Sequence, residues 1–153
     1  MLSRQLQSPN WVKVGQHNII PRAHLKCSIK GGIPVKQLEW ETPEEEKNMI
    51  ANEIGRLVSQ GVQLKRIIIL SPYRKENSCL GGVDRIKEWP LTEDIESRTN
   101  AVRFQTIRSF KGLEADIVFL TGIKKDSRVC TDADIYVGGS RARFLLYIFR
   151  EKQ

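Results

Sequence analysis

The sequence predicts an α/β fold whose sheet is mainly parallel. Two observations indicate this class: strand-like segments alternate with helix-like segments, and several strand-like segments are apolar without interruption. Such alternation is typical of parallel sheets covered by helices, and a continuous apolar run indicates a strand that is buried on both faces. With 153 residues, the chain is most simply one domain.

The net charge of +7 is unevenly distributed along the chain. The segment from Met1 to Leu38 contains six Lys and Arg residues and no Asp or Glu. A basic excess of this kind suits a polyanion such as nucleic acid, because neutralised phosphates release their counterions. Ordinary basicity of a soluble protein is the alternative that charge alone leaves open.

The composition also bears on location and on metal chemistry. No apolar run approaches the ~18 residues of a membrane span, and the first residues lack the apolar core of a signal peptide, so we expect a cytoplasmic protein with no membrane partner. Cys27, Cys79 and Cys130 are far apart, and they form neither a metal pair nor a disulfide framework. Since His17 and His24 complete no zinc pattern with Cys27, we expect no metal site.

The first well-marked element is a helix that follows a short strand. Residues 1–33 contain several breakers and are expected to be irregular, either as a basic arm or as a truncated domain edge, and residues 34–153 form the ordered domain. Residues 33–40 alternate as a strand does. Thr42 is then the expected N-cap, with Pro43 at the first helical position and Glu45 completing a capping box. Gly61 is expected to end this helix.

Four more strands and a second helix are predicted further along. An apolar strand stops at Ser71, and residues 75–100 are expected to form a loop with a short helix near 83–89. Strands are predicted within residues 101–107 and 115–122, and the run FLLYIF closes the chain as the last strand. Before it, Thr131 and Asp134 form a capping box that predicts a helix from about 132 to 143. Two glycines in that segment weaken the helix by ~1 kcal/mol each relative to alanine.

Basic residues flank the predicted strands in three clusters, which are Arg74, then Arg108 with Lys111, then Arg141 with Arg143. Ligands of parallel sheets bind beyond the carboxyl ends of the strands, which predicts that residues 71–74 and 106–112 share one rim. The planar fork of an arginine suits phosphate oxygens, and a glycine after a lysine lets backbone N–H groups approach an anion. A surface arginine is more often simply solvated, so no cluster defines a site by itself.

Several motifs of nucleotide and nucleophile chemistry are absent from the sequence. There is no Gly-x-x-x-x-Gly-Lys-[Ser/Thr] segment and no Gly-Lys dipeptide, so the chain has no phosphate-binding loop of its own. Ser71, Ser109 and Ser140 have no histidine nearby in the sequence and no nucleophile-elbow context. A Rossmann-type dinucleotide enzyme would share the fold class, but no Gly-x-Gly-x-x-Gly follows any strand.

Three segments resemble the C-terminal half of a UvrD/Rep-like superfamily 1 DNA helicase. FQTIRSFKGLEADIVFLTG is similar to the family's Thr-x-His-x-x-Lys-Gly-Leu-Glu turn and the strand after it. ADIYVGGSRARFLLYIF is similar to the Tyr-Val-Ala-x-Thr-Arg-Ala-Arg segment before the family's last strand. IIILSPYR resembles the preceding motif, an apolar strand that ends in an arginine, and the resemblance covers roughly residues 34–150.

The resemblance implies a RecA-like three-layer sandwich that serves as the second of two motor domains. ATP and Mg²⁺ would lie between the domains and would be held mainly by the first domain, which is missing from this chain. By motif match, Arg74 and Arg141 would reach the γ-phosphate and stabilise its developing charge. Glu114 would face the ribose of the nucleotide.

The same resemblance implies a side that contacts single-stranded DNA. Thr106 and Arg108 would touch the backbone phosphates, and Lys111 and Gly112 would hold the turn that links this side to the nucleotide. Two departures from the family stand out. The family's histidine is Arg108 here, and its Ala-x-Thr is Gly138-Gly139-Ser140, which loosens the helix expected to present Arg141.

Two functions therefore remain open at the level of sequence. The first is the second motor domain of an ATP-dependent DNA helicase or translocase, inactive as an ATPase when alone because the phosphate loop is absent. The alternative is a stand-alone nucleic-acid-binding or regulatory module that keeps a degenerate helicase fold. Arg108 and the two glycines before Ser140 favour this alternative.

Overall fold

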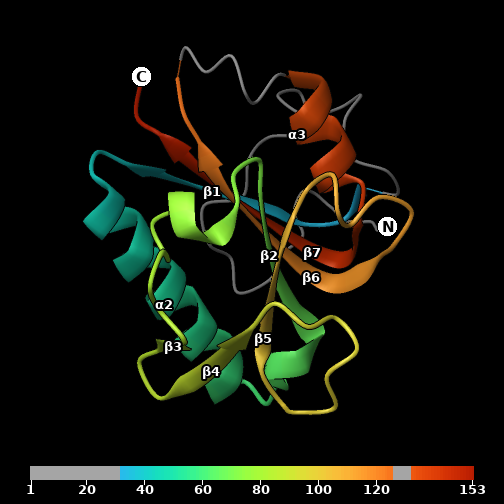
Figure 1. Ribbon diagram of the computed structural model, residues 1–153. Helices are drawn as coiled ribbons and strands as arrows, with labels where there is room; N and C mark the ends of the chain where they lie inside the picture. Colours follow the sequence, from blue (N-terminus) through green and yellow to red (C-terminus); the bar gives the residue numbers. More distant parts are fainter. Residues whose placement is uncertain (1–31, 126–131) are drawn as a thin grey trace.

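The computed structural model describes residues 32–125 and 132–153. Of the segment 1–33, which is expected to be irregular, only residues 32 and 33 are among the described residues. Thr131, the expected N-cap of the second helix, lies outside them. Within them the chain forms a seven-stranded sheet with α2 on one face and α3 on the other (Figure 1). The prediction of a RecA-like three-layer α/β sandwich with a mainly parallel sheet is confirmed.

The sheet has the order β1-β7-β6-β2-β5-β4-β3. All of its strands run parallel except the short edge strand β3, which pairs antiparallel with β4. The two helices and seven strands are, in chain order, β1 (Val35–Trp40), α2 (Pro43–Ser59), β2 (Ile67–Ser71), β3 (Arg85–Ile86), β4 (Trp89–Thr92), β5 (Val102–Thr106), β6 (Ala115–Ile123), α3 (Asp132–Gly139) and β7 (Ala142–Glu151). Single 3-10 turns lie at Leu64–Arg66 (η2) and Lys75–Asn77 (η3).

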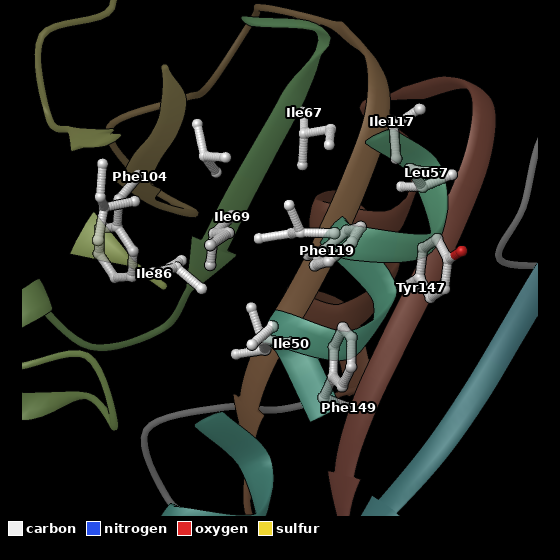
Figure 2. Packing of buried hydrophobic residues seen from close by; sticks show 14 of the residues in the cluster. Ile50, Leu57, Ile67, Ile69, Ile86, Phe104, Ile117, Phe119, Tyr147 and Phe149 are labelled. Atoms are coloured by element: carbon white, nitrogen blue, oxygen red, sulfur yellow. The ribbon is translucent and has the colours of Figure 1, made fainter. Parts of the chain in front are cut away.

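One face of the sheet forms the larger core beneath α2. Ile50, Ile54 and Leu57 of the helix are buried against alternate residues of the central strands (Figure 2). Those strand residues are Ile67 and Ile69 of β2, Phe104 of β5, Ile117 and Phe119 of β6, and Tyr147 and Phe149 of β7. Burial of apolar side chains at this scale is the main favourable contribution to folding.

The residues between them in the same strands point to the opposite face. Ile68 and Leu70 of β2 pack there with the matching residues of β6 and β7, beneath Ile135 of α3 and beneath Ile107 and Phe110. Because successive side chains of a strand alternate between faces, one apolar run fills both cores. The prediction that the strand beginning at Ala115 is buried on both faces is confirmed.

Helix α2 begins and ends as its sequence predicts. Thr42 Oγ1 accepts the Glu45 N–H at 3.1 Å, and the Glu45 carboxylate accepts the Thr42 N–H at 3.2 Å, which completes the capping box. At the other end Gly61 has a φ of 93°. The Gly61 N–H donates to Val58 O, and the next N–H donates to Leu57 O, which is the Schellman pattern.

The short helix predicted near residues 83–89 is wrong, because this segment is the β3–β4 hairpin. Lys87 turns the hairpin with a φ of 56°, and β4 then pairs with β5. The ring of Trp89 would lie 3.1 Å from a Cβ on Gly55, so the hairpin packs tightly on α2 through that glycine. The pairing of β4 with β5 and the contact of Trp89 with Gly55 both join residues that are distant in the sequence, and together they outweigh the local preference for a helix.

The helix predicted from 132 to 143 is shorter in the structure. Helix α3 ends at Gly139, and the Ser140 N–H still donates to Tyr136 O. The carbonyl of Arg141 instead accepts the Ala115 N–H at 2.9 Å, so the chain has already joined β6. The sequence predicted that Arg143 precedes the last strand, whereas in the structure Arg143 lies inside β7. Among the described residues, no helix is both long and apolar enough to cross a membrane.

Candidate functional site

The carboxyl ends of β2 and β5 lie side by side, as predicted. The two strands are parallel neighbours, with Ser71 opposite Thr106. The Ile107 N–H donates to Ser71 O at 2.9 Å, so the pairing continues one residue beyond β5. The segments that carry Arg74 and Arg108 therefore leave the same edge of the sheet.

A hollow of about 850 Å³ lies at this edge. Arg74, Thr106 and Arg108 all contribute to its lining, and Asp134 at the start of α3 lines it as well. The hollow is lined by as many basic as acidic side chains. The basic ones are Arg74, Lys75 and Arg108, and the acidic ones are Glu76, Glu93 and Asp134. The hollow is thus lined by the segments that follow β2 and β4, by the end of β5 with the turn after it, and by α3, which are far apart in the sequence.

Thr106 shapes the turn that borders the hollow. Its hydroxyl donates to Ser109 Oγ at 2.8 Å and accepts the Ser109 N–H at 3.1 Å. The Phe110 N–H donates to the carbonyl of Thr106 at 3.1 Å, and Phe110 itself is buried in the core under α3. This anchoring holds the backbone of the turn in place, while the side chain of Arg108 is exposed to solvent.

Lys111 and Gly112 continue the turn toward β6. The Lys111 N–H donates to Arg108 O at 3.2 Å, and the Lys111 side chain is exposed. Gly112 has a φ of 82° with no atom within 4 Å of the position of a Cβ. Glycine is therefore favoured here by backbone conformation and not by a close contact.

Glu114 and Arg141 lie together at the opposite end of the strands. They directly precede β6 and β7, whose first residues Ala115 and Ala142 are paired. Glu114 is exposed, whereas Arg141 is half-buried. The Arg141 Nε is buried and has no hydrogen-bond partner among the described residues. A buried guanidinium donor without a partner is costly, and among the described residues Trp40 Nε1 and Arg150 Nε are in the same state.

The predicted site residues thus form two groups and not one. Arg74, Thr106 and Arg108 gather at the hollow beyond the carboxyl ends of the strands. Glu114 and Arg141 lie at the amino ends, and the segment from Thr106 to Glu114 runs between the two groups. Arg74 and Arg141, which the resemblance assigns to the same phosphate, belong to different groups.

Arg143 forms an ion pair with Asp116 at the amino end of the sheet. Its Nη2 lies 2.7 Å from Asp116 Oδ1, while Arg66 Nε lies 2.6 Å from Asp116 Oδ2. Burial raises the pKa of the Asp116 carboxyl, but the hydrogen bonds and charges of the two arginines outweigh this and hold its pKa below the usual range. The two ion pairs join η2, β6 and β7.

Sequence reasoning missed a buried carboxylate beneath the carboxyl edge. Glu46 of α2 is only 3% exposed, and its Oε2 accepts the Gly122 N–H at 2.7 Å. It also hydrogen-bonds with the Cys79 thiol, and burial raises the pKa of the Glu46 carboxyl despite these bonds. Nothing local in the sequence indicates these partners, because Gly122 and Cys79 lie far from Glu46 along the chain.

The acidic members of the hollow were also missed as site residues. Glu93 falls in what the sequence presents as a polar loop, and Asp134 is predicted only as a capping residue. Among the described residues, no group of three or more His, Cys, Asp or Glu side chains could hold a metal ion.

The fold and the site define a RecA-like α/β domain with a polar hollow at the carboxyl edge of its sheet. Residues 29–149 match the AAA_12 family, described as an AAA domain, and the chain belongs to this family. A solved structure of similar fold is the C-terminal domain of a possible DNA helicase from Lactobacillus plantarum WCFS1. It matches with a TM-score of 0.60 and 17% sequence identity over 76% of this chain and 71% of that one. No curated protein gives a significant match.

Proposed function

We propose that this chain is the second motor domain of an ATP-dependent DNA helicase or translocase of the UvrD/Rep-like superfamily 1. The membership in an AAA domain family and the fold shared with the C-terminal domain of a possible DNA helicase support this proposal. So does the order of the three motif-like segments along the chain. The proposal includes a first motor domain, in the same chain or another, that this sequence does not contain.

The observation that carries the proposal is the course of the segment from Thr106 to Glu114. It begins at the hollow, is anchored by Phe110, and ends beside Arg141 at the start of β7. A segment of this kind can link a DNA contact at one end with a nucleotide contact at the other. A motor domain needs such a link, because nucleotide hydrolysis must change the grip on the strand.

On the nucleotide side, we assign the γ-phosphate contact to Arg141. Its buried Nε without a described partner suits an anion supplied by another domain. Glu114, which directly precedes β6 beside it, would face the ribose. ATP would supply the phosphoryl group and Mg²⁺ would neutralise its charge, both held mainly by the first domain, since this chain has no phosphate loop.

On the DNA side, Thr106 and Arg108 would contact the phosphates of a single strand at the hollow. The rigid turn around Thr106 fixes the backbone, and the exposed Arg108 offers a charged fork to the phosphate. Arg74 lines the same hollow. Its role in the family resemblance is a γ-phosphate contact, whereas its place in the fold favours the strand, so the two roles need separate measurement.

The proposal is tested by ATPase measurements after mixing the chain with a first motor domain that carries the phosphate loop. Alone, the chain should not hydrolyse ATP. In the reconstituted motor, Arg141→Ala should lower the DNA-stimulated kcat by about 10³-fold or more, as expected for an arginine finger. Arg98→Ala, an exposed arginine outside the hollow, serves as the matched control and should leave kcat unchanged.

Arg74→Ala separates its two candidate roles in the same assay. A loss of kcat with unchanged affinity for single-stranded DNA assigns Arg74 to the γ-phosphate, and a loss of DNA affinity assigns it to the strand. ATPase activity of the isolated chain would contradict the proposal, as would full turnover of the Arg141 variant. DNA binding without any stimulation of a first domain would instead support a stand-alone nucleic-acid-binding module.

A further inference from the structure

The hollow at the carboxyl edge is not a uniformly positive surface. Its three basic side chains are balanced by Glu76, Glu93 and Asp134, which come from η3, from the loop after β4 and from α3. A site that bound phosphate alone would gain nothing from these carboxylates, because like charges repel. The balance instead suits a ligand that carries an anionic group at one end and hydrogen-bond donors at the other.

The size and the walls of the hollow suit a ligand larger than phosphate. Its volume of about 850 Å³ lies within the range of small-molecule sites, ~300–1,000 Å³. Pro72, Phe104 and Ile107 contribute apolar wall to the otherwise polar lining. A nucleotide combines all three properties that the hollow offers to a ligand: an anionic phosphate, a flat apolar face, and polar groups on the edge of the base.

We infer that the hollow binds one unstacked nucleotide of the DNA strand and selects bases that carry an exocyclic amino group. The basic side chains hold the flanking phosphates, and Glu93 and Asp134 accept hydrogen bonds from the amino group. Carboxylates recognise cytosine through its N4 amino group, whereas thymine has at that position the O4 acceptor, which a carboxylate repels, and keeps only its N3–H as a donor. This inference rests on the proposed DNA contact and adds a base preference to it.

The preference is measured by fluorescence anisotropy with two oligonucleotides, oligo(dC) and oligo(dT), of equal length at one salt concentration. Both are unpaired pyrimidine strands with the same phosphate charge, so the electrostatic part of binding is matched. The isolated chain should bind oligo(dC) about fivefold more tightly or better, which corresponds to one good contact between a carboxylate and a base.

Two substitutions assign the preference to the hollow. In Glu93→Gln and Asp134→Asn, the amide offers a donor as well as an acceptor, so oligo(dT) is no longer repelled and the preference should fall to within about twofold. Glu96→Gln is the matched control, since Glu96 is an exposed acid on the same loop that does not line the hollow, and it should keep the preference. Glu93 is exposed in a loop, so its variant tests the inference even if the Asp134 variant folds poorly.

The outcomes separate this inference from the proposed function. Equal binding of the two oligonucleotides by the unmodified chain, or a preference that survives both substitutions, overturns the base selectivity and leaves the DNA contact standing. Failure to bind either oligonucleotide overturns both. A preference for oligo(dC) that is lost in the Glu93 variant and kept in the Glu96 variant supports the inference.

Discussion

Replacing Gly122 by alanine is expected to destabilise the fold strongly. Gly122 lies where the pairing of β6 with β7 becomes irregular, and its φ is 70°. A Cβ on this residue would lie 2.9 Å from Ser71 Oγ and 3.4 Å from a ring carbon of Tyr73. Ser71 cannot yield freely, because it is fully buried and its Oγ accepts the Tyr73 N–H at 3.0 Å.

The magnitude follows from two costs and one gain. A left-handed backbone costs an alanine ~1–2 kcal/mol, and an extra methyl group in a packed site costs ~1–3 kcal/mol. The loss of unfolded-state freedom returns ~0.4–1 kcal/mol. The free energy of unfolding should therefore fall by about 1–5 kcal/mol, with the middle of the range at ~3 kcal/mol.

Gly112→Ala is the matched control for backbone strain. Gly112 has a similar φ of 82°, but no atom lies within 4 Å of its Cβ position. Only the strain and the unfolded-state gain apply, so this variant should lose about 1 kcal/mol. The difference between the two variants measures the contact with Ser71 and Tyr73.

The assay is urea denaturation followed by circular dichroism, with linear extrapolation of the free energy of unfolding. In Gly122→Ala combined with Ser71→Ala, the closest atom is removed, so the double variant should be more stable than the sum of the single losses predicts. Equal losses for Gly122→Ala and Gly112→Ala, or strictly additive losses in the double variant, would refute the steric reasoning.

Substitutions at three more positions probe the buried and edge contacts by the same denaturation assay. Burial raises the pKa of Glu46, so its protonated form is favoured in the folded state, and stability should fall as the pH rises from the unfolded-state pKa through the folded one. Glu46→Gln should abolish this fall and be at least as stable at pH 7, whereas Glu46→Ala leaves the Gly122 N–H without its acceptor and should lose about 1–3 kcal/mol. The pKa of Asp116 is instead lowered, so its contribution is present above the unfolded-state pKa and lost as the pH falls through the folded one. Asp116→Asn should remove that acid-dependent loss and cost about 1 kcal/mol at pH 7, because both arginine partners are about half exposed. Gly138→Ala restores the residue of the resembled family and places a Cβ 2.8 Å from Leu120 Cδ1. This variant should lower the free energy of unfolding by about 1–2 kcal/mol, although alanine has the better helix propensity. A stabilised variant would contradict this packing.

The elements that the sequence predicts well are those with a local signal. Helix α2 carries its own capping box at Thr42 and its own terminator at Gly61, so both ends can be read without the rest of the chain. The strands β2 and β6 are continuous apolar runs, and only burial on both faces explains such runs. The turn at Gly112 was also recognisable, because glycine tolerates the required φ.

The elements that the sequence predicts poorly depend on distant partners. Nothing near Trp89 indicates that its ring packs on Gly55 or that its strand pairs with β5. The end of α3 is set by the bond between Ala115 N–H and Arg141 O, which joins residues far apart along the chain. The glycine at position 138 was interpreted as a loosened helix, whereas the structure shows it lying close against Leu120.

The sequence alone determined the class of fold, the shared rim of the β2 and β5 ends, and the segment from Thr106 to Glu114 as the centre of interest. These follow from short-range patterns, namely hydrophobic periodicity, caps and turn residues. Only the tertiary structure decided that Arg74 and Arg141 lie in separate groups, that Glu93 and Asp134 line the hollow, and that Glu46 is buried against Gly122. The reason is that strand register and chain reversal bring together residues with no short-range relation, and no local pattern records which of them meet.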